Sequence, residues 1–208
     1  MMHTSDERIS KVKIGIFGGT FNPPHLGHLI IAEHVREKFG LDKVIFVPSA
    51  VPPHKRELDI VEAHHRIEML NAAVQGNRHF EVSELEIQRG GVSFTVDTLM
   101  ELWGLYHDHE LYLLIGMDNW VEFHTWRTPE KILELAHLVV MTRSGVESRQ
   151  NGMKLADKVI FCEVPEIGIA SRDIRKRIAD SKSIRYQVPL AVELYIYQHQ
   201  LYRTMSDG

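Results

Sequence analysis

The chain has 208 residues, 44 % of them hydrophobic and 25 % charged, which is the balance of a globular protein and not of a disordered or fibrous one. Lysine and arginine number 24 against 28 acidic residues, and the formal net charge of -4 disfavours a nucleic-acid-binding module. The single cysteine, Cys162, excludes an intrachain disulfide framework and fits a reducing cytoplasm. Because no apolar run reaches the roughly 18 residues of a membrane span, and Met1 to Lys11 is not a signal peptide, we expect a cytoplasmic protein without membrane contacts.

The first half of the chain alternates short apolar runs with helical patterns. A buried strand is predicted at 12–17 and a second strand at 43–48. Apolar residues at helical spacing predict helices at 26–39, where Gly40 is a suitable stop, and at 61–75. Residues 80–87 alternate and predict an extended segment, and 95–103 predict a further helix.

The second half repeats this alternation. Strands are predicted at 110–115, 137–141 and 158–162, and helices at 129–136, 171–180 and 189–200. Such a pattern predicts an α/β fold, a doubly wound and mostly parallel sheet with helices on both faces. We expect one domain over 1–208, with flexible tails at 1–11 and 203–208. Ligands of such sheets bind beyond the carboxyl ends of the strands, here after Phe17, Val47, Ile115 and Met141.

The loop after the first strand, Gly18 to His28, carries the strongest chemical signal. Gly18 and Gly19 end the strand, where the backbone must turn sharply or let a ligand approach closely. The following helix directs its free N–H groups at the same opening, which suits an anion. His25 and His28 share one face of its first turn, where imidazoles can donate to phosphate oxygens and carry positive charge near neutral pH.

Other interpretations of this loop stay open. Gly-Gly after a strand can be a plain tight turn, and His25 with His28 can be a metal pair, although no third ligand is evident nearby. Neither the Walker phosphate loop nor the dinucleotide-binding Gly-x-Gly-x-x-Gly pattern is present. The combination of strand, Gly-Gly, Pro-rich turn and His-x-Gly-His is more specific than any of its parts.

His25-Leu26-Gly27-His28 resembles the signature of the nucleotidyltransferase superfamily, and the chain from Lys13 to about Tyr197 resembles the bacterial nicotinate-nucleotide adenylyltransferases within it. Four further segments carry the resemblance: Val51 to Lys55, Ser93 to Leu99, Gly116 to Asp118 with Trp126 beyond it, and Ile169 to Arg175. Three positions depart from the family pattern. Asn22 stands where relatives often have Asp, Ala170 stands where Ser is frequent, and Arg172 stands where Thr often follows the serine.

The resemblance implies a Rossmann-like fold and transfer of AMP from ATP to nicotinate mononucleotide in NAD biosynthesis, with Mg²⁺ carried by the triphosphate and no protein metal site. It implies that the substrate's own phosphate is the nucleophile, so that catalysis consists of positioning and charge stabilisation. The implied roles are catalysis for His25 and His28, ATP binding for Gly18, Gly19, Thr20, Phe21, Asp118, Ser171 and Arg175, and acceptor binding for Lys55, Thr95 and Trp126.

Several of these residues also fit ordinary structural roles. Ser171 suits a helix N-cap with Arg175 on the same face, Asp118 suits another N-cap, Trp126 suits core packing, and Lys55 suits a solvated loop. Arg143 after the strand at 137–141 is a further candidate for ATP contact.

The competing functions are a sister adenylyltransferase acting on nicotinamide mononucleotide or phosphopantetheine, a non-catalytic nucleotide sensor, and a zinc or nucleic-acid-binding module. A sensor predicts loss of His25, His28, Ser171 or Arg175, and all four are present. The sequence leaves a homo-oligomer open, since helix surfaces and interfaces look alike at this level.

Overall fold

The computed structural model describes residues 11–50, 60–106, 108–143 and 159–203, and every structural statement below concerns these ranges. The elements are β1 Lys13–Gly19, α1 Leu26–Phe39, β2 Lys43–Pro48, α2 Ala63–Val74, β3 Phe80–Val82, α3 Leu85–Arg89, α4 Thr95–Leu105, β4 Glu110–Gly116, α5 Met117–Glu122, the 3₁₀ helix η1 Phe123–Thr125, α6 Pro129–Leu135, β5 His137–Thr142, β6 Val159–Glu163, α7 Ser171–Ala179 and α8 Leu190–Gln198. Within the described ranges, no helix is long and apolar enough to cross a bilayer.

The described strands form one six-stranded parallel sheet in the order β3-β2-β1-β4-β5-β6. The chain therefore winds outward from β1 in one direction and then, from β4, in the other. This reversal between β1 and β4 confirms the doubly wound fold predicted from the alternating pattern. In sheets of this kind the ligand crevice lies at that switch point.

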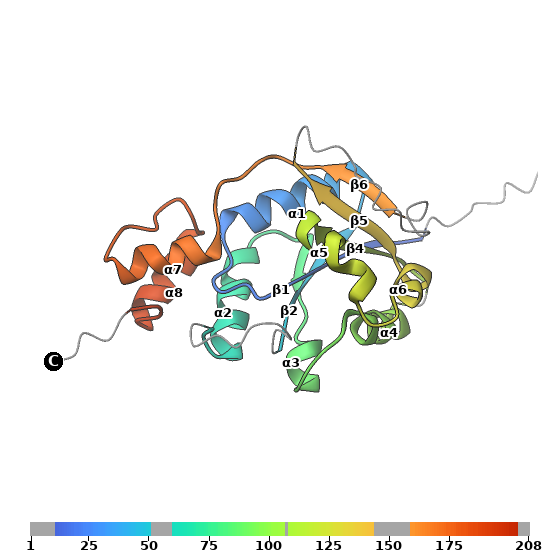
Figure 1. The fold of residues 1–208 in the computed structure, drawn as a ribbon. Coiled ribbons are helices and arrows are strands. Elements are labelled where there is room, and N and C mark those ends of the chain that lie inside the picture. The colour runs from blue at the N-terminus through green and yellow to red at the C-terminus, as the bar shows by residue number, and fades with distance from the viewer. Residues whose placement is uncertain (1–10, 51–59, 107, 144–158, 204–208) are drawn as a thin grey trace, which may run out of the picture.

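Helices cover both faces of the sheet (Figure 1). On one face, α4, α5, η1 and α6 pack onto β1, β4 and β5 through a core that includes Leu99, Trp120 and Ile132. On the other face, α1 and α2 pack through a second core that includes Val35 and Leu70. Strands covered on both faces must be apolar on both, which is why they read as unbroken hydrophobic runs in the sequence.

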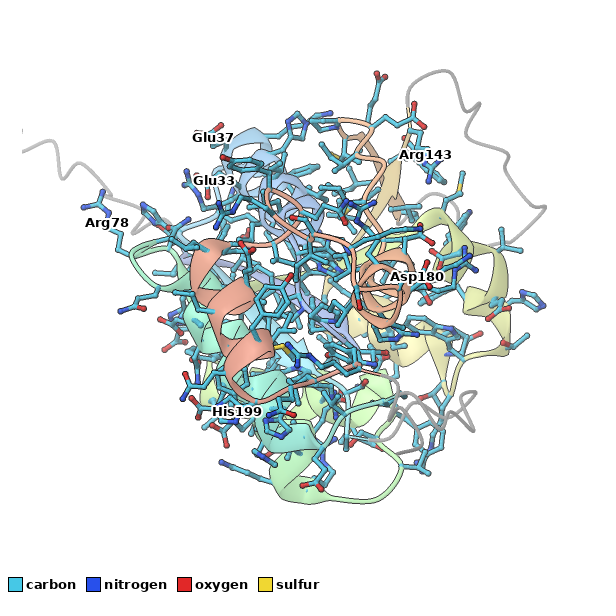
Figure 2. The ribbon with its side chains drawn as sticks, turned by 90° about the vertical axis from the view of Figure 1, so that its left-hand side faces the viewer. Glu33, Glu37, Arg78, Arg143, Asp180 and His199 are labelled. Carbon is cyan, nitrogen blue, oxygen red and sulfur yellow. The ribbon has the colours of Figure 1, made fainter. Side chains whose placement is uncertain are left out.

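The last two helices extend this second layer. A third core joins Met69 of α2 to Ile174 of α7 and to Val192 and Ile196 of α8. Figure 2 shows α7 and α8 from the side, with His199 at the end of α8. The rings of His199 and His65, the latter on α2, lie 5.3 Å apart. The C-terminal helices are thus fixed to the first half of the chain through α2.

Local sequence explains where several elements begin and end. Helix α1 ends at Gly40, whose left-handed φ of 60° lets its N–H donate to the carbonyls of Arg36 and Glu37. Pro129 occupies the first turn of α6, where its missing N–H removes no helical bond.

The extended segment predicted at 80–87 is wrong beyond Val82. Only Phe80–Val82 pairs with β2, and Leu85–Arg89 forms α3. The apolar residues Val82 and Leu85 are three apart, a helical interval that interrupts the two-residue alternation of a strand. Gly90, with a φ of 69°, then ends this short helix.

Candidate active site

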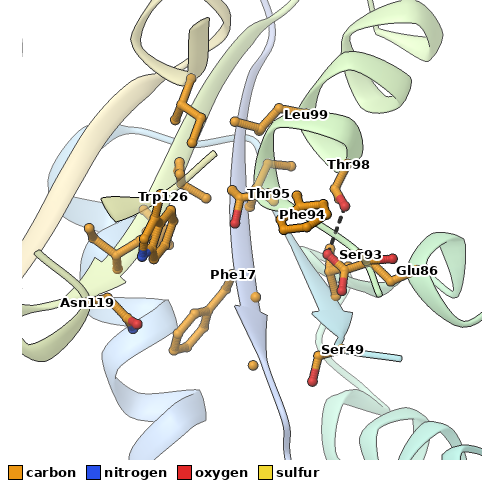
Figure 3. Close-up of a pocket in the computed structure, with 18 of the residues that line it drawn as sticks. Phe17, Ser49, Glu86, Ser93, Phe94, Thr95, Thr98, Leu99, Asn119 and Trp126 are labelled. Carbon is orange, nitrogen blue, oxygen red and sulfur yellow. Dashed lines mark hydrogen bonds between the residues drawn. The ribbon is translucent and has the colours of Figure 1, made fainter. Parts of the chain in front are cut away.

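A cavity of about 700 Å³ opens at the carboxyl ends of β1, β2 and β4. Its walls include Phe17, Val47 and Ile115, three of the four strand ends at which the sequence predicts a site, whereas Met141 is not among the lining residues. Six residues with predicted binding roles line the cavity: Gly18, Gly19, Thr20, Thr95, Asp118 and Trp126. In Figure 3, Trp126 lies on one side of β1 and Phe94, Ser93 and Glu86 lie on the other.

The loop between β1 and α1 turns at Phe21 and not at the two glycines. Phe21 has a left-handed φ of 49°, and neither Gly18 nor Gly19 has a positive φ. The absence of a side chain at Gly19 makes room for Phe21, because an added Cβ would come within 3.0 Å of that ring. Phe21 is 2 % exposed and packs edge-on against Phe17 and His28, so its side chain supports the loop from inside the core.

His25 and His28 form a stacked pair at the start of α1. Their ring centroids lie 3.6 Å apart with an interplanar angle of 23°. The backbone N–H of His25 donates to Nδ1 of His28 over 3.2 Å, so this nitrogen is the acceptor and the ring proton of neutral His28 lies on Nε2. Gly27 completes the arrangement, since an added Cβ would come within 3.0 Å of His25 Nδ1.

Burial removes the positive charge that the sequence leads us to expect on these rings. It lowers the pKa of His25 to about 4. It also lowers the pKa of His28 well below its usual value, and repulsion from a protonated His25 lowers it further. Both imidazoles are therefore neutral at pH 7 in the unliganded protein. Each ring can then donate one N–H and accept at its other nitrogen, and it carries no positive charge.

Ser171 and Arg175 of α7 reach the same loop from the C-terminal part of the chain. The Ser171 hydroxyl donates to the carbonyl of Pro23 over 2.8 Å, and Arg175 Nη1 donates to the carbonyl of Asn22 over 2.9 Å. Ser171 is the first residue of α7 and the N-cap is Ala170, so the N-cap role suggested by the sequence is wrong. The hydroxyl bonds across the fold instead of within its own helix.

Asp118 sits in the first turn of α5, and the N-cap of that helix is Gly116. The alternative role of Asp118 as an N-cap is therefore also wrong. A Cβ at residue 116 would come within 2.5 Å of Asp118 Oδ1, so only glycine lets this carboxylate lie so close to the end of β4. The predicted roles of Lys55 concern a residue outside the described ranges.

Trp126 combines the two roles that the sequence left open. It packs against the core formed by α4 to α6, with its ring 5.4 Å from that of Phe123, and it also lines the cavity. Arg143, a further candidate for ATP contact, lies at the surface and pairs with Glu166 at 3.2 Å, and it is not among the lining residues (Figure 2).

Arg66 is a functional candidate that the sequence reasoning missed. Its side chain is 1 % exposed, and its guanidinium donates to the carbonyls of Thr20, Ser49 and Ala50 over 3.0, 2.7 and 3.2 Å. It thereby joins the segments that follow β1 and β2. Its position in α2 could have indicated that Arg66 is buried, because it shares the buried face of this helix with Met69, Leu70 and Ala73.

A second missed group lies on the opposite wall. The Thr98 hydroxyl donates to Glu86 over 2.8 Å (Figure 3). Arg89 donates to Thr98 and to Ser93. Burial raises the pKa of Glu86, which lines the cavity. These bonds join α3 to the start of α4, which carries Thr95.

The sheet order and the cavity at its switch point are typical of a nucleotide-binding α/β protein. A family model described as cytidylyltransferase-like matches residues 16–177. Curated relatives named "Probable nicotinate-nucleotide adenylyltransferase" include one from Thermomicrobium roseum, 46 % identical over 93 % of each chain. Another, from Desulfitobacterium hafniense strain Y51, is 45 % identical over 92 % of this chain and 96 % of its own.

The chain therefore belongs to the cytidylyltransferase-like family, among the nicotinate-nucleotide adenylyltransferases. A solved structure of Plasmodium falciparum nicotinic acid mononucleotide adenylyltransferase complexed with NaAD has the same fold. It superposes with a TM-score of 0.75 at 18 % identity and covers 92 % of this chain and 97 % of its own.

Proposed function

We propose that this protein transfers AMP from MgATP to nicotinate mononucleotide and releases pyrophosphate and the deamido form of NAD. The observation that carries the proposal is the buried pair of neutral imidazoles, His25 and His28, at the start of α1. The pair ends the loop whose first residues, Gly18 to Thr20, line the cavity at the switch point of the sheet. Curated relatives at 40–46 % identity carry the name of this activity, which supports the choice of acceptor.

The reaction needs no nucleophile from the protein. An oxygen of the acceptor's 5′-phosphate attacks the α-phosphorus of ATP. The new P–O bond forms as the bond to the oxygen bridging the α- and β-phosphates breaks, and pyrophosphate leaves with that electron pair. The protein contributes position and charge stabilisation, which are the main resources of catalysis at phosphate.

The loop and the histidine pair would stabilise the triphosphate. A neutral imidazole donates one N–H, and in His28 that donor is Nε2, because Nδ1 accepts from the backbone. His25 and His28 would donate to oxygens on which charge develops as pyrophosphate leaves. Gly18, Gly19 and Thr20 would lie along the nucleotide, and Ser171 and Arg175, already bonded to the loop, would complete the phosphate site.

The cavity would hold the two nucleosides. Asp118 would accept hydrogen bonds from ribose hydroxyls, and Trp126 would stack on the pyridine ring. Thr95, at the start of α4, would lie near the pyridine carboxylate. Lys55 would approach the phosphates from the segment after β2.

Nucleotidyltransferases of this kind take ATP together with a divalent metal. We propose Mg²⁺ as that metal and place it on the triphosphate as part of the substrate, because this hard cation prefers phosphate oxygens and retains several waters. We further propose that the reaction takes place in the cytoplasm, as the single cysteine suggests.

The test measures pyrophosphate release with ATP and Mg²⁺ and offers nicotinate mononucleotide, nicotinamide mononucleotide and phosphopantetheine in parallel. We expect release with the nicotinate compound and a loss of at least a hundredfold in His28→Ala, the cost of one preorganised donor to a developing oxyanion. His137→Ala is the matched control, because this exposed residue begins β5 at the opposite edge of the sheet.

Release with another acceptor alone would keep the phosphate chemistry and reject the acceptor. Equal rates in wild type and His28→Ala would reject the role of the histidine pair. The absence of release with all three acceptors would reject the function itself.

A further inference from the structure

The charged groups on the cavity wall are unevenly distributed. Glu86, Asp118 and Glu122 contribute carboxylates, and among the described lining residues Arg127 is the one lysine or arginine. An acceptor that carries a carboxylate brings a further negative charge into this cavity. Its binding there requires a cation or a set of strong donors to offset the repulsion.

Arg127 lies between the two walls of the cavity. It directly follows Trp126, and its guanidinium carbon lies 4.8 Å from the ring centroid of Phe94. Phe94 is the N-cap of α4, and both Phe94 and Thr95 line the cavity. The cation therefore lies beside the start of α4 and directly follows the tryptophan in the chain. Figure 3 shows Phe94 and Trp126 on opposite sides of β1.

The present partner of Arg127 does not hold it firmly. Within the described ranges, its one hydrogen bond goes to Asp97, from Nη1 to Oδ2 over 3.4 Å. The two side chains are 56 % and 37 % exposed, and such exposed single-contact pairs contribute little. A guanidinium carries five N–H donors in a planar fork that matches a carboxylate, so most of its donors remain to be used.

We propose that Arg127 determines the preference for nicotinate over nicotinamide by pairing its guanidinium with the pyridine carboxylate. This inference rests on the proposed function and adds to it the residue that distinguishes the two acceptors. An amide is neutral and presents an NH₂ to the guanidinium, so the same residue that attracts the carboxylate gains little from the amide.

The experiment compares kcat/KM for nicotinate mononucleotide and nicotinamide mononucleotide in wild type, Arg127→Gln and Arg127→Lys. We expect the ratio of the two values to fall roughly tenfold in Arg127→Gln, the size of one charge-assisted hydrogen bond at a half-exposed site. In Arg127→Lys the ratio should be intermediate, because lysine keeps the charge but lacks the planar fork.

Two control variants separate recognition from simpler effects. Lys131→Gln removes an equal charge from α6, where Lys131 pairs with Glu134 at 3.0 Å and does not line the cavity. Asp97→Asn breaks the ion pair to α4 and leaves the cation in place. We expect both controls to keep the wild-type ratio.

Three outcomes would overturn the inference. An unchanged ratio in Arg127→Gln, with wild type active on nicotinate mononucleotide, rejects the role of Arg127 and leaves the proposed function standing. An equal fall in Arg127→Gln and Asp97→Asn assigns the effect to the ion pair between α4 and Arg127. Wild type without activity on nicotinate mononucleotide rejects the proposed function and the inference together.

Discussion

At the scale of single residues, the two ends of the His-x-Gly-His sequence depend on the glycine inside it. The ring of His25 occupies space that any Cβ at residue 27 would enter, and Ile167 closes the same space at 3.3 Å from that Cβ position. That the two histidine rings lie close together could be predicted from their spacing in the sequence. Their neutrality could not, because it follows from burial by segments that are distant in the sequence.

Gly27→Ala should therefore reduce activity without unfolding the protein. The added methyl group displaces the His25 ring by a few tenths of an ångström, and we expect kcat/KM for ATP to fall by between about tenfold and a hundredfold. Steady-state kinetics and thermal unfolding measure the two effects.

Gly104→Ala is the matched control, since this glycine also lies in a helix but a Cβ there meets nothing within 4 Å. It should keep full activity and stabilise the protein by about 0.5–1 kcal/mol through helix propensity. Wild-type kinetics in Gly27→Ala would show that the histidine pair tolerates displacement.

At the scale of elements, helix α2 connects the segments that follow β1 and β2. Arg66 gives this helix three hydrogen bonds to carbonyls of those segments. The helix itself was predictable from its apolar periodicity. The hydrogen bonds of Arg66 could not be predicted from the sequence, because they depend on the sheet order, which places the ends of β1 and β2 side by side.

Arg66→Met should destabilise the protein, because it leaves three partly buried carbonyls without this donor. At about 1 kcal/mol for each partly buried acceptor that loses its donor, we expect a loss of about 3 kcal/mol in the free energy of unfolding, measured by urea titration. Arg78→Met, at an exposed arginine seen at the surface in Figure 2, should change it by less than about 0.5 kcal/mol. Equal small changes in the free energy of unfolding of both variants would show that Arg66 does not stabilise the segments that follow β1 and β2.

At the scale of the whole molecule, the alternation of strands and helices was enough to predict the fold, because strands buried on both faces are apolar throughout. Prediction failed where an element is short and lies at an edge. β3 pairs with β2 over only three residues, and the chain then turns into α3. The contacts of Ser171 with Pro23 and of Arg175 with Asn22 also could not be predicted. They join residues that are 148 and 153 positions apart in the sequence.

Burial of an imidazole makes folding depend on pH. The pKa of His25 is about 4 in the folded protein and near 6.5 in an unfolded chain, so between these values the unfolded chain binds the extra proton. Stability should therefore fall as the pH is lowered from 6.5 towards 4, by up to about 1.4 kcal/mol per pH unit for one proton.

Urea unfolding at several pH values measures this slope. The slope should be smaller in His25→Gln and should stay at the wild-type value in His137→Gln, which removes an exposed ring. A slope in His25→Gln that equals the wild-type slope would contradict the assignment of this pH dependence to His25.

The bond from the Tyr202 hydroxyl to Oδ1 of Asn22, 2.8 Å long, joins the two ends of the described chain. The ribosome adds Asn22 to the growing chain 180 residues before it adds Tyr202. During synthesis, the loop that leads into the histidine pair therefore lacks this support until α8 and Tyr202 have emerged and docked. A nascent chain acquires the finished loop only after these C-terminal residues have been synthesised.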